Sequence, residues 1–376
     1  MKVVVVAPGR LHAFELALQL QKKGMLHQLI TGYPKFEVLK YGIQKDKIKS
    51  IYLNEIINRL TYKIFKDYRY DYLACEAFDL YNSKTIDTSA DAYIIWSSYA
   101  EHTIAKIKKH NPNAKIILER GSAHIEVQEE ILSAKEGKPV IHPKIIKKEL
   151  NEYTSTDYIS IPSIFVKESF IEKGISSNKL FLNNYGVDIS QFPFQFKKTQ
   201  ADKFTIGYVG TLSRQKNIQG LIEAVRVLKE QGVNINLLLV GPIDHQSFDE
   251  DLLHQPFIEY VGYQKQSTLK DYYKLMDVFV LNSIQDGFGM VISQALASGV
   301  PVIATNTTGG LDIIIDGYNG FVIPSNNQTE LINKLKYCIQ NIERVDEMKN
   351  NAYKSVSDNL TWDAYGERYI NFLNNI

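Results

Sequence analysis

Residues 286–305 read DGFGMVISQALASGVPVIAT and place a turn, a helix and a strand in one short unit. The turn, residues 286–289, contains two glycines, which let the backbone approach a ligand closely. Residues 290–298 carry apolar side chains at helical spacing, and Gly299 ends the predicted helix. Residues 300–304 are apolar throughout, which is typical of a short parallel strand covered on both faces. A helix that starts behind a glycine turn offers N–H groups to phosphate or carboxylate oxygens, although an ordinary loop-to-helix joint has the same pattern.

Strand-like and helical runs alternate on both sides of this unit, which predicts parallel sheets in an α/β fold. In the first half, strands are expected at 3–6, 29–31, 92–96 and 115–118. In the second half, strands are expected at 205–209, 236–240, 257–261 and 278–281, with a helix at 218–228. We therefore predict two Rossmann-like domains, 1–195 and 204–361, joined by a polar connector. An amphipathic, aromatic-rich helix is expected at about 362–376.

Composition indicates a soluble globular protein. The 376 residues suit two domains, and 44% are hydrophobic and 23% charged. Two cysteines, Cys75 and Cys338, are too few for a disulfide framework or a zinc site and favour a reducing compartment. No apolar run approaches the roughly 18 residues of a spanning helix, and residues 1–7 read as a strand rather than a signal peptide. A cytoplasmic protein is expected.

Charge is distributed unevenly along the chain. Residues 1–195 contain 27 Lys and Arg against 22 Asp and Glu, whereas the rest contains 16 against 20. Residues 35–70 hold nine basic and four acidic side chains, with aromatic and aliphatic residues between them. Such a segment can dock on anionic lipid, or it can be a solvated pair of helices. The net charge of +1 gives no support for nucleic-acid binding.

Residues 286–305 resemble the signature of the retaining GT-B glycosyltransferases of family GT4, E-G-F-G-x4-E-A-x-A-x-G-x-P-V-I-A. In that family the first glutamate contacts the transferred sugar and the second holds the ribose of the nucleotide. This chain has Asp286 and Gln294 at these positions. Aspartate keeps the charge on a shorter side chain, and glutamine keeps an acceptor oxygen. The resemblance covers almost the whole chain, least over 35–90, and implies two Rossmann-like domains facing across a cleft, with the C-terminal helix crossing back to the first domain.

The resemblance also implies a set of donor-binding residues. Lys216 falls where the family has its phosphate-binding lysine, and Arg214 lies two residues before it. Tyr263 falls where the nucleobase usually stacks, although an aromatic residue there can equally be packing. The turn and the helix start would act through backbone N–H groups. The expected donor-binding residues are Gly9, Gly210, Thr211, Arg214, Lys216, Tyr263, Asp286, Gly287, Phe288, Gly289, Met290, Val291 and Gln294.

His124 is the expected polar group at the sugar from the first domain. It follows the strand at 115–118, where the family commonly has a histidine near the reacting carbon. A lone loop histidine can equally be a surface residue. Glu119 and Arg120 are second choices, and we interpret His12 as structural. The expected catalytic set is His124, Asp286, Lys216 and Arg214.

By resemblance, the chain is expected to be a retaining, metal-independent hexosyltransferase. It would move a sugar from a UDP- or GDP-sugar to a hydroxyl of a glycan or lipid-linked acceptor, in bacterial polysaccharide synthesis, without a bound cofactor. Its expected location is the cytoplasm, and one alternative is that it also binds peripherally at the inner face of the membrane. Two alternatives stay open: a catalytically weak partner subunit that binds nucleotide, and a nucleotide-sugar epimerase. P-loop, G-x-G-x-x-G and H-E-x-x-H motifs do not occur.

Overall fold

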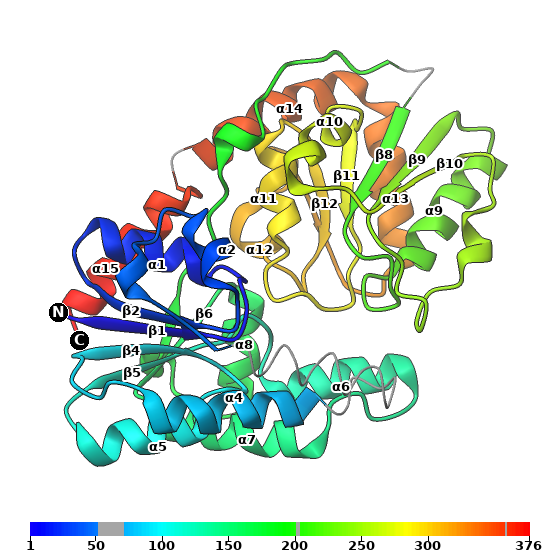
Figure 1. The fold of residues 1–376 in the computed structure, drawn as a ribbon. Helices are drawn as coiled ribbons and strands as arrows, with labels where there is room; N and C mark the ends of the chain where they lie inside the picture. Colours follow the sequence, from blue (N-terminus) through cyan, green and yellow to red (C-terminus); the bar gives the residue numbers. More distant parts are fainter. Residues whose placement is uncertain (52–70, 201–203, 358) are drawn as a thin grey trace. The chain divides into compact units, whose positions relative to one another are not determined.

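A computed structural model describes residues 1–51, 71–200, 204–357 and 359–376 (Figure 1). These residues form two compact units. Unit 1 comprises Met1–Pro162, Val166–Asn183 and Tyr365–Ile376, and unit 2 comprises Ser163–Phe165 and Asn184–Ala364. The C-terminal half of the basic segment at 35–70 lies outside the described residues, so only residues 35–51 of it are considered below.

Unit 1 contains a seven-stranded sheet in the order β3-β2-β1-β4-β5-β6-β7, with parallel pairing throughout. Its strands are β1 (Val3–Ala7), β2 (Leu26–Thr31), β3 (Ile48–Ser50), β4 (Ala92–Trp96), β5 (Lys115–Glu119), β6 (Tyr158–Ile161) and β7 (Leu180–Leu182). Every residue of β1 and β4 is buried. The uninterrupted apolar runs at these positions therefore form the centre of a sheet that is covered on both faces.

Eight α-helices of the described residues belong wholly or mainly to unit 1. They are α1 (Ala13–Lys22), α2 (Lys35–Leu39), α4 (Asp71–Thr85), α5 (Glu101–His110), α6 (Ile125–Glu136), α7 (Pro143–Ser155), α8 (Ile164–Glu172) and α15 (Trp362–Asn374). The last helix, α15, buries Tyr365, Tyr369 and Leu373 in this unit. Gly366 of α15 lies so close to α1 that a Cβ there would be 2.5 Å from the Gln19 Cβ. The predicted return of the C-terminal helix to the first domain is confirmed (Figure 1).

Unit 2 contains a six-stranded parallel sheet in the order β10-β9-β8-β11-β12-β13. Its strands are β8 (Phe204–Val209), β9 (Ile235–Val240), β10 (Ile258–Gly262), β11 (Val278–Leu281), β12 (Val302–Thr305) and β13 (Gly320–Ile323). Its α-helices are α9 (Ile218–Glu230), α10 (Leu269–Tyr273), α11 (Met290–Ala297), α12 (Gly310–Ile313), α13 (Gln328–Gln340) and α14 (Ile342–Ser357). Helix α9 contacts α13, and α11 contacts α14. Its short 3₁₀ turns are η4 (Ile189–Gln191), η5 (Glu250–Leu253) and η6 (Gln266–Thr268), whereas η1 (Lys45–Lys47) and η3 (Ser177–Lys179) belong to unit 1. The predicted pair of Rossmann-like domains is confirmed.

Several details of the strand prediction are wrong. The strand expected at 300–304 begins only at Val302, directly after Pro301, which has no N–H for a central ladder. The edge strands β3, β7 and β13 were not expected, because each is short, and β13 begins with a glycine. That glycine is required: a Cβ on Gly320 would lie 2.0 Å from the Val302 carbonyl oxygen. Close backbone approach, rather than apolar pattern, defines this edge of the sheet.

The strand order of each sheet reverses once, between β1 and β4 in unit 1 and between β8 and β11 in unit 2. In parallel α/β sheets, ligands bind outside the carboxyl ends of the strands at such a switch point. Each of the four loops that follow these strands contains a residue with left-handed backbone: Leu11, Ser98, Asn217 and Gly289, with φ between 38° and 72°. Glycine adopts this conformation freely, but Leu11, Ser98 and Asn217 are strained by it, and such strain concentrates at functional sites. The fold therefore predicts that ligands bind at these four loops.

Candidate functional site

The loops after β8 and β11 are joined to each other in unit 2. The Ile284 amide donates to the Gln215 carbonyl at 2.9 Å, and Gln215 Nε2 donates to the Gln285 carbonyl at 3.0 Å. Next to these bonds, Lys216 Nζ lies 2.5 Å from Asp286 Oδ2, and both side chains are about a fifth exposed. The structure thus brings together two residues that were predicted from separate motifs.

The turn at 286–289 is held through its backbone. The Asp286 amide donates to the Thr307 carbonyl at 2.9 Å, and the Phe288 carbonyl accepts the Gly309 amide at 2.9 Å. Gly289 has a φ of 72°, and a Cβ there would lie 2.6 Å from Leu281 Cδ2. Only glycine fits this position, and the chain enters α11 directly after it. The predicted glycine turn and helix are confirmed.

The first turn of α11 presents N–H groups. In the part of the chain that the structure describes, the amides of Phe288, Gly289, Met290 and Val291 have no hydrogen-bond acceptor. No acidic side chain occupies the first turn of this helix. Unsatisfied N–H groups and the helix dipole together favour an anion here. With the Lys216 ammonium at the preceding turn, the arrangement suits a phosphate group.

The other predicted residues of the β8 loop lie at its surface. Gly210 has a φ of 147°, and a Cβ there would lie 2.7 Å from the Tyr208 hydroxyl oxygen. Thr211 and Arg214 are exposed, and the Arg214 amide donates to Ser247 Oγ at 3.2 Å. Thr211 and Arg214 therefore share a loop with Lys216, and their roles stay predictions.

Gln294 lies on α11 and is buried, with 8% of its surface exposed. Its Oε1 atom accepts the hydroxyl of Tyr273 at 3.1 Å, and Tyr273 itself is fully buried. The acceptor oxygen expected for a ribose is therefore already occupied by a protein hydroxyl. A ribose would have to share this oxygen or bind the amide nitrogen.

Tyr263 follows β10 and is 71% exposed. The packing interpretation of this residue is therefore wrong, because an aromatic ring that packs in a core would be covered. Its predicted contact with a nucleobase stays a prediction.

In unit 1, the loop after β1 contains Gly9 and leads to a buried histidine. His12 Nε2 lies 2.9 Å from Glu119 Oε1, and the Tyr369 hydroxyl donates to Glu119 Oε2 at 3.2 Å. Glu119, the second choice for a group at the sugar, is only 1% exposed and holds these two partners. The structural interpretation of His12 agrees with this geometry. Gly9 lies at the carboxyl end of β1, and its approach to phosphate stays a prediction.

His124 is the N-cap of α6 and is only 2% exposed. Its Nδ1 accepts the Glu126 amide at 3.4 Å, and its ring packs against Tyr153 and Phe170. Burial, reinforced by the nearby Arg120 guanidinium, lowers the pKa of His124 to about 4. The alternative that His124 is a surface residue is wrong, because its ring is buried against Tyr153 and Phe170. Its catalytic role stays a prediction.

Sequence reasoning missed two carboxylates on α7. Glu149 Oε1 accepts the Ser98 hydroxyl at 2.5 Å, and Glu152 Oε2 accepts the Ser98 amide at 2.7 Å. Arg120, another second choice, is buried with its Nε 3.2 Å from Glu149. Burial, and then the adjacent Glu149 charge, raise the pKa of Glu152 well above its ordinary value. Acidic residues on an amphipathic helix read as surface groups, so the sequence carried no signal for this cluster.

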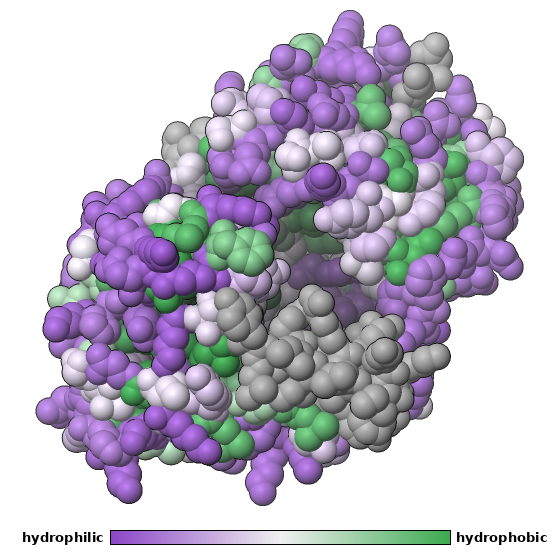
Figure 2. All heavy atoms as spheres, viewed as in Figure 1, coloured by the Kyte–Doolittle hydropathy of each residue, from purple (hydrophilic) through white to green (hydrophobic). Residues whose placement is uncertain are grey.

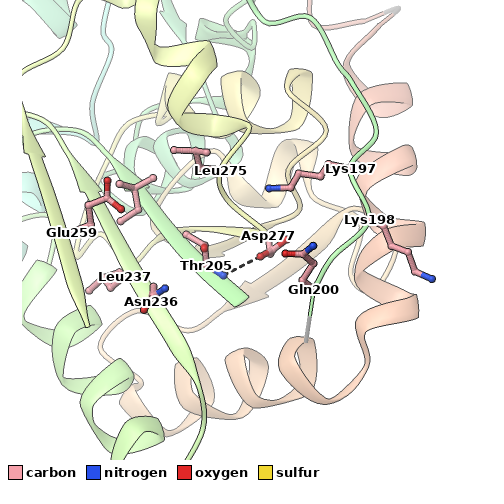
Figure 3. Close-up of a pocket in the computed structure, with 10 residues that line it drawn as sticks. Lys197, Lys198, Gln200, Thr205, Asn236, Leu237, Glu259, Leu275 and Asp277 are labelled. Carbon is pink, nitrogen blue, oxygen red and sulfur yellow. Dashed lines mark hydrogen bonds between the residues drawn. The ribbon is translucent and has the colours of Figure 1, made fainter. Parts of the chain in front are cut away.

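A separate hollow of about 130 Å³ lies at the amino ends of the unit 2 strands (Figure 3). Lys197 and Asp277 point into it, whereas Lys198 points away. The Asp277 carboxylate accepts the Thr205 amide at 2.9 Å and binds Lys349 Nζ at 2.9 Å. These contacts join β8 to the start of β11. Because the hollow lies at the amino ends of the strands, it is at the opposite end of the sheet from the switch-point loops, which follow the carboxyl ends.

Within residues 1–51, 71–200, 204–357 and 359–376, no group of three or more His, Cys, Asp or Glu could hold a metal ion. No helix in the same ranges is long and apolar enough to cross a membrane.

Comparisons with known proteins agree with this geometry. Residues 191–355 match the model of the family described as glycosyl transferases group 1. The capsular polysaccharide biosynthesis glycosyltransferase CapM of Staphylococcus aureus is 28% identical over 207 residues, which cover 53% of this chain and 54% of CapM. The trehalose synthase of Pyrococcus horikoshii is 26% identical over 239 residues, 57% of each chain. The matched region thus spans about half the length of these relatives.

Solved structures match over the whole chain. Sucrose-phosphate synthase from Thermosynechococcus elongatus superposes with a TM-score of 0.75 at 18% identity, covering 100% of this chain and 98% of that one. HepE of Anabaena, solved in complex with UDP, superposes with a TM-score of 0.69 at 14% identity and covers all of both chains. At these identities the likeness shows the fold, which is GT-B. The family resemblance predicted from residues 286–305 is confirmed. Residues 191–355, which include the signature at 286–305, therefore match the glycosyl transferases group 1 family.

Proposed function

We propose that this chain is a retaining glycosyltransferase that moves a sugar from a nucleoside-diphosphate donor to a hydroxyl acceptor. One observation carries the proposal. Lys216 and Asp286 form an ion pair at the switch point of the unit 2 sheet. The amides at the start of α11, which have no acceptor among the described residues, follow Asp286 closely in the chain. A cation and N–H groups suit a diphosphate, and a carboxylate suits sugar hydroxyls. The site thus offers complementary groups for both parts of a nucleotide sugar.

The chemistry follows from these groups. As the bond between the anomeric carbon and the phosphate oxygen breaks, negative charge grows on the diphosphate, and Lys216 with the α11 amides neutralises it. The acceptor oxygen bonds to the anomeric carbon from the same face, and its proton passes to the leaving phosphate. No carboxylate nucleophile and no protein-bound metal are needed in this scheme.

The relatives support particular substrates. HepE was solved with UDP-glucose, which makes UDP-sugars the first donors to test. CapM is named for capsular polysaccharide biosynthesis, and WcaL of Escherichia coli is named for colanic acid biosynthesis. We therefore propose a glycan or lipid-linked glycan as acceptor.

A membrane contact through the basic segment forms part of this proposal. In its described part, Phe36 is 65% exposed and Leu39 39% exposed on α2, beside Lys40. Lys40 pairs with Glu37, and Lys47 donates to the Leu26 carbonyl, so these ammonium groups already have protein partners. Figure 2 shows mainly hydrophilic residues on the face in view, with hydrophobic residues in small groups. The support for lipid docking therefore rests on α2, and the location at the inner face of the membrane depends on it.

A thermal-shift panel with UDP, GDP, ADP and CMP tests the donor site. A nucleotide that binds the folded state at 100 times its Kd adds about 2.7 kcal/mol of stability, which a melting curve detects. We expect one nucleoside diphosphate to raise the Tm, and Lys216→Gln to reduce the rise. Lys336→Gln, an equal change at an exposed position of α13, is the matched control. No shift with any nucleotide would remove the proposal.

A partner subunit that binds nucleotide without efficient turnover is the second candidate. The contact of Gln294 with Tyr273 favours it, because a ribose would have to share the Gln294 oxygen with a buried hydroxyl or bind the amide nitrogen instead. Turnover decides between the two: nucleotide binding without release of UDP from UDP-glucose, with or without glycan acceptors, would favour the partner subunit.

A further inference from the structure

The signature turn has a hydrogen-bond partner from a remote part of the chain. Ser163 is fully buried, and its hydroxyl donates to the Gly287 carbonyl at 2.5 Å. The two residues are 124 positions apart. Ser163–Phe165 belong to unit 2, although the residues on either side of this short segment belong to unit 1.

The geometry of a peptide bond gives this contact a directional effect. A trans peptide is planar, so the Gly287 carbonyl and the Phe288 N–H point in opposite directions. The described residues contain no cis peptide. A hydroxyl that holds the carbonyl therefore also fixes where the Phe288 N–H points. This N–H is one of the α11 donors that have no acceptor among the described residues.

The next peptide is held in the same way. The Phe288 carbonyl accepts the Gly309 amide at 2.9 Å, which fixes the direction of the Gly289 N–H. Both N–H groups of the turn are thus aimed by hydrogen bonds on the opposite side of their peptides. Gly309 immediately precedes α12, so this helix supports the turn directly.

Helix α12 also fixes the Ser163 segment. The Asp312 carboxylate on α12 accepts the Ile164 amide at 3.0 and 3.1 Å, and it accepts Asn184 Nδ2 at 2.9 Å. Asp312 is half-buried, and burial raises its pKa to about 6. The hydroxyl of Ser163 is therefore presented by a segment that cannot easily shift relative to the turn.

We propose that Ser163 is a positioning residue of the donor site, whose hydroxyl turns the Gly287 peptide so that the Phe288 N–H meets the diphosphate. This inference rests on the proposed function. The serine itself does not touch the ligand; it acts through the peptide that does.

The test compares UDP and GDP binding to the full chain by calorimetry at a temperature where circular dichroism shows every variant folded. Without the hydroxyl, the peptide can rotate and the N–H loses its direction. We expect Ser163→Ala to raise the Kd of the nucleotide about 3- to 10-fold, the range of one hydrogen bond. Ser163→Thr restores a hydroxyl and should recover affinity to within about twofold.

Two further measurements separate positioning from general stability. Ser355 of α14 also donates its hydroxyl to a carbonyl, that of Ala352 at 2.7 Å, and Ser355→Ala should leave the Kd unchanged. Hydrogen exchange should show that nucleotide protects the Phe288 amide in the wild type and protects it less in Ser163→Ala. Wild-type affinity and protection in Ser163→Ala would overturn the inference alone. Absence of nucleotide binding by the wild type would overturn the proposed function, and the inference with it.

Discussion

Asp286→Asn should strengthen the binding of free nucleoside diphosphate. In the structure the Lys216 ammonium is neutralised by the Asp286 carboxylate at 2.5 Å. A phosphate that approaches this lysine meets the carboxylate charge as well. Asparagine removes the charge and keeps an oxygen of similar position, and the backbone contact of residue 286 with the Thr307 carbonyl is unaffected. The variant therefore isolates the electrostatic effect of the pair.

The magnitude follows from Coulomb's law. Two unit charges about 6 Å apart interact by about 2.8 kcal/mol at an effective dielectric constant of 20, and by about 0.7 kcal/mol at 80. Because both side chains are about a fifth exposed, solvent screens part of the repulsion. We expect a gain of about 1 kcal/mol, which is a roughly fivefold lower Kd for UDP.

Calorimetric titration with UDP at low and high salt measures this effect. The gain should shrink at high salt, where screening already weakens the repulsion. Asp271→Asn removes the same charge from an exposed position of unit 2 and should change the Kd little. On the proposed function, sugar transfer by Asp286→Asn should fall even as UDP binds more tightly, because the residue proposed to accept the sugar hydroxyls loses its charge. Weaker UDP binding by Asp286→Asn, similar to that of Lys216→Gln, would refute the reasoning.

Three further predictions concern buried polar groups. Burial raises the pKa of Asp312 from 3.8 to about 6, so its ionisation lowers the stability of the folded state as the pH rises from 3.8 to 6, and the full cost is present above pH 6. By urea unfolding, Asp312→Asn should therefore be about 1–2 kcal/mol more stable than the wild type at pH 8 and equal to it below pH 3.8, and a gain that is the same at both pH values would contradict this. Burial lowers the pKa of His124 from 6.5 to about 4, so the stability that the neutral ring contributes is complete above pH 6.5 and is lost as the pH falls toward 4. His124→Asn keeps a capping oxygen and should flatten the plot of unfolding free energy against pH in this range, whereas an unchanged slope would show that other groups cause it. Gln294→Leu should lower the free energy of unfolding by about 1–2 kcal/mol because the Tyr273 hydroxyl loses its acceptor, while Gln294→Glu, which keeps an acceptor, should be tolerated. Equal losses of unfolding free energy by the two variants in chemical denaturation would show that this hydrogen bond is unimportant.

The central strands and the signature turn could be predicted from local pattern. Uninterrupted apolar runs such as residues 3–6 need cover on both faces, and a parallel sheet supplies it. The turn before α11 needs a left-handed residue, which glycine at 289 provides. Both features depend on residues that are adjacent in the chain, so a short window of sequence contains the information. The edge strand β13 was missed because its position depends on a close approach to Val302, which no local pattern records.

For the candidate site, too, the local sequence predicted some features and the tertiary structure determined others. Amino-acid pattern alone indicated that Lys216 and Asp286 both follow strands and that the start of α11 can bind an anion. Folding decided that the two side chains meet, that His124 is buried and neutral, and that Ser163 holds the Gly287 peptide. Backbone conformation and apolar periodicity are short-range properties that the local sequence encodes. Desolvation and hydrogen-bond pairing depend on which distant segments the completed fold packs together, so they are defined only in the tertiary structure.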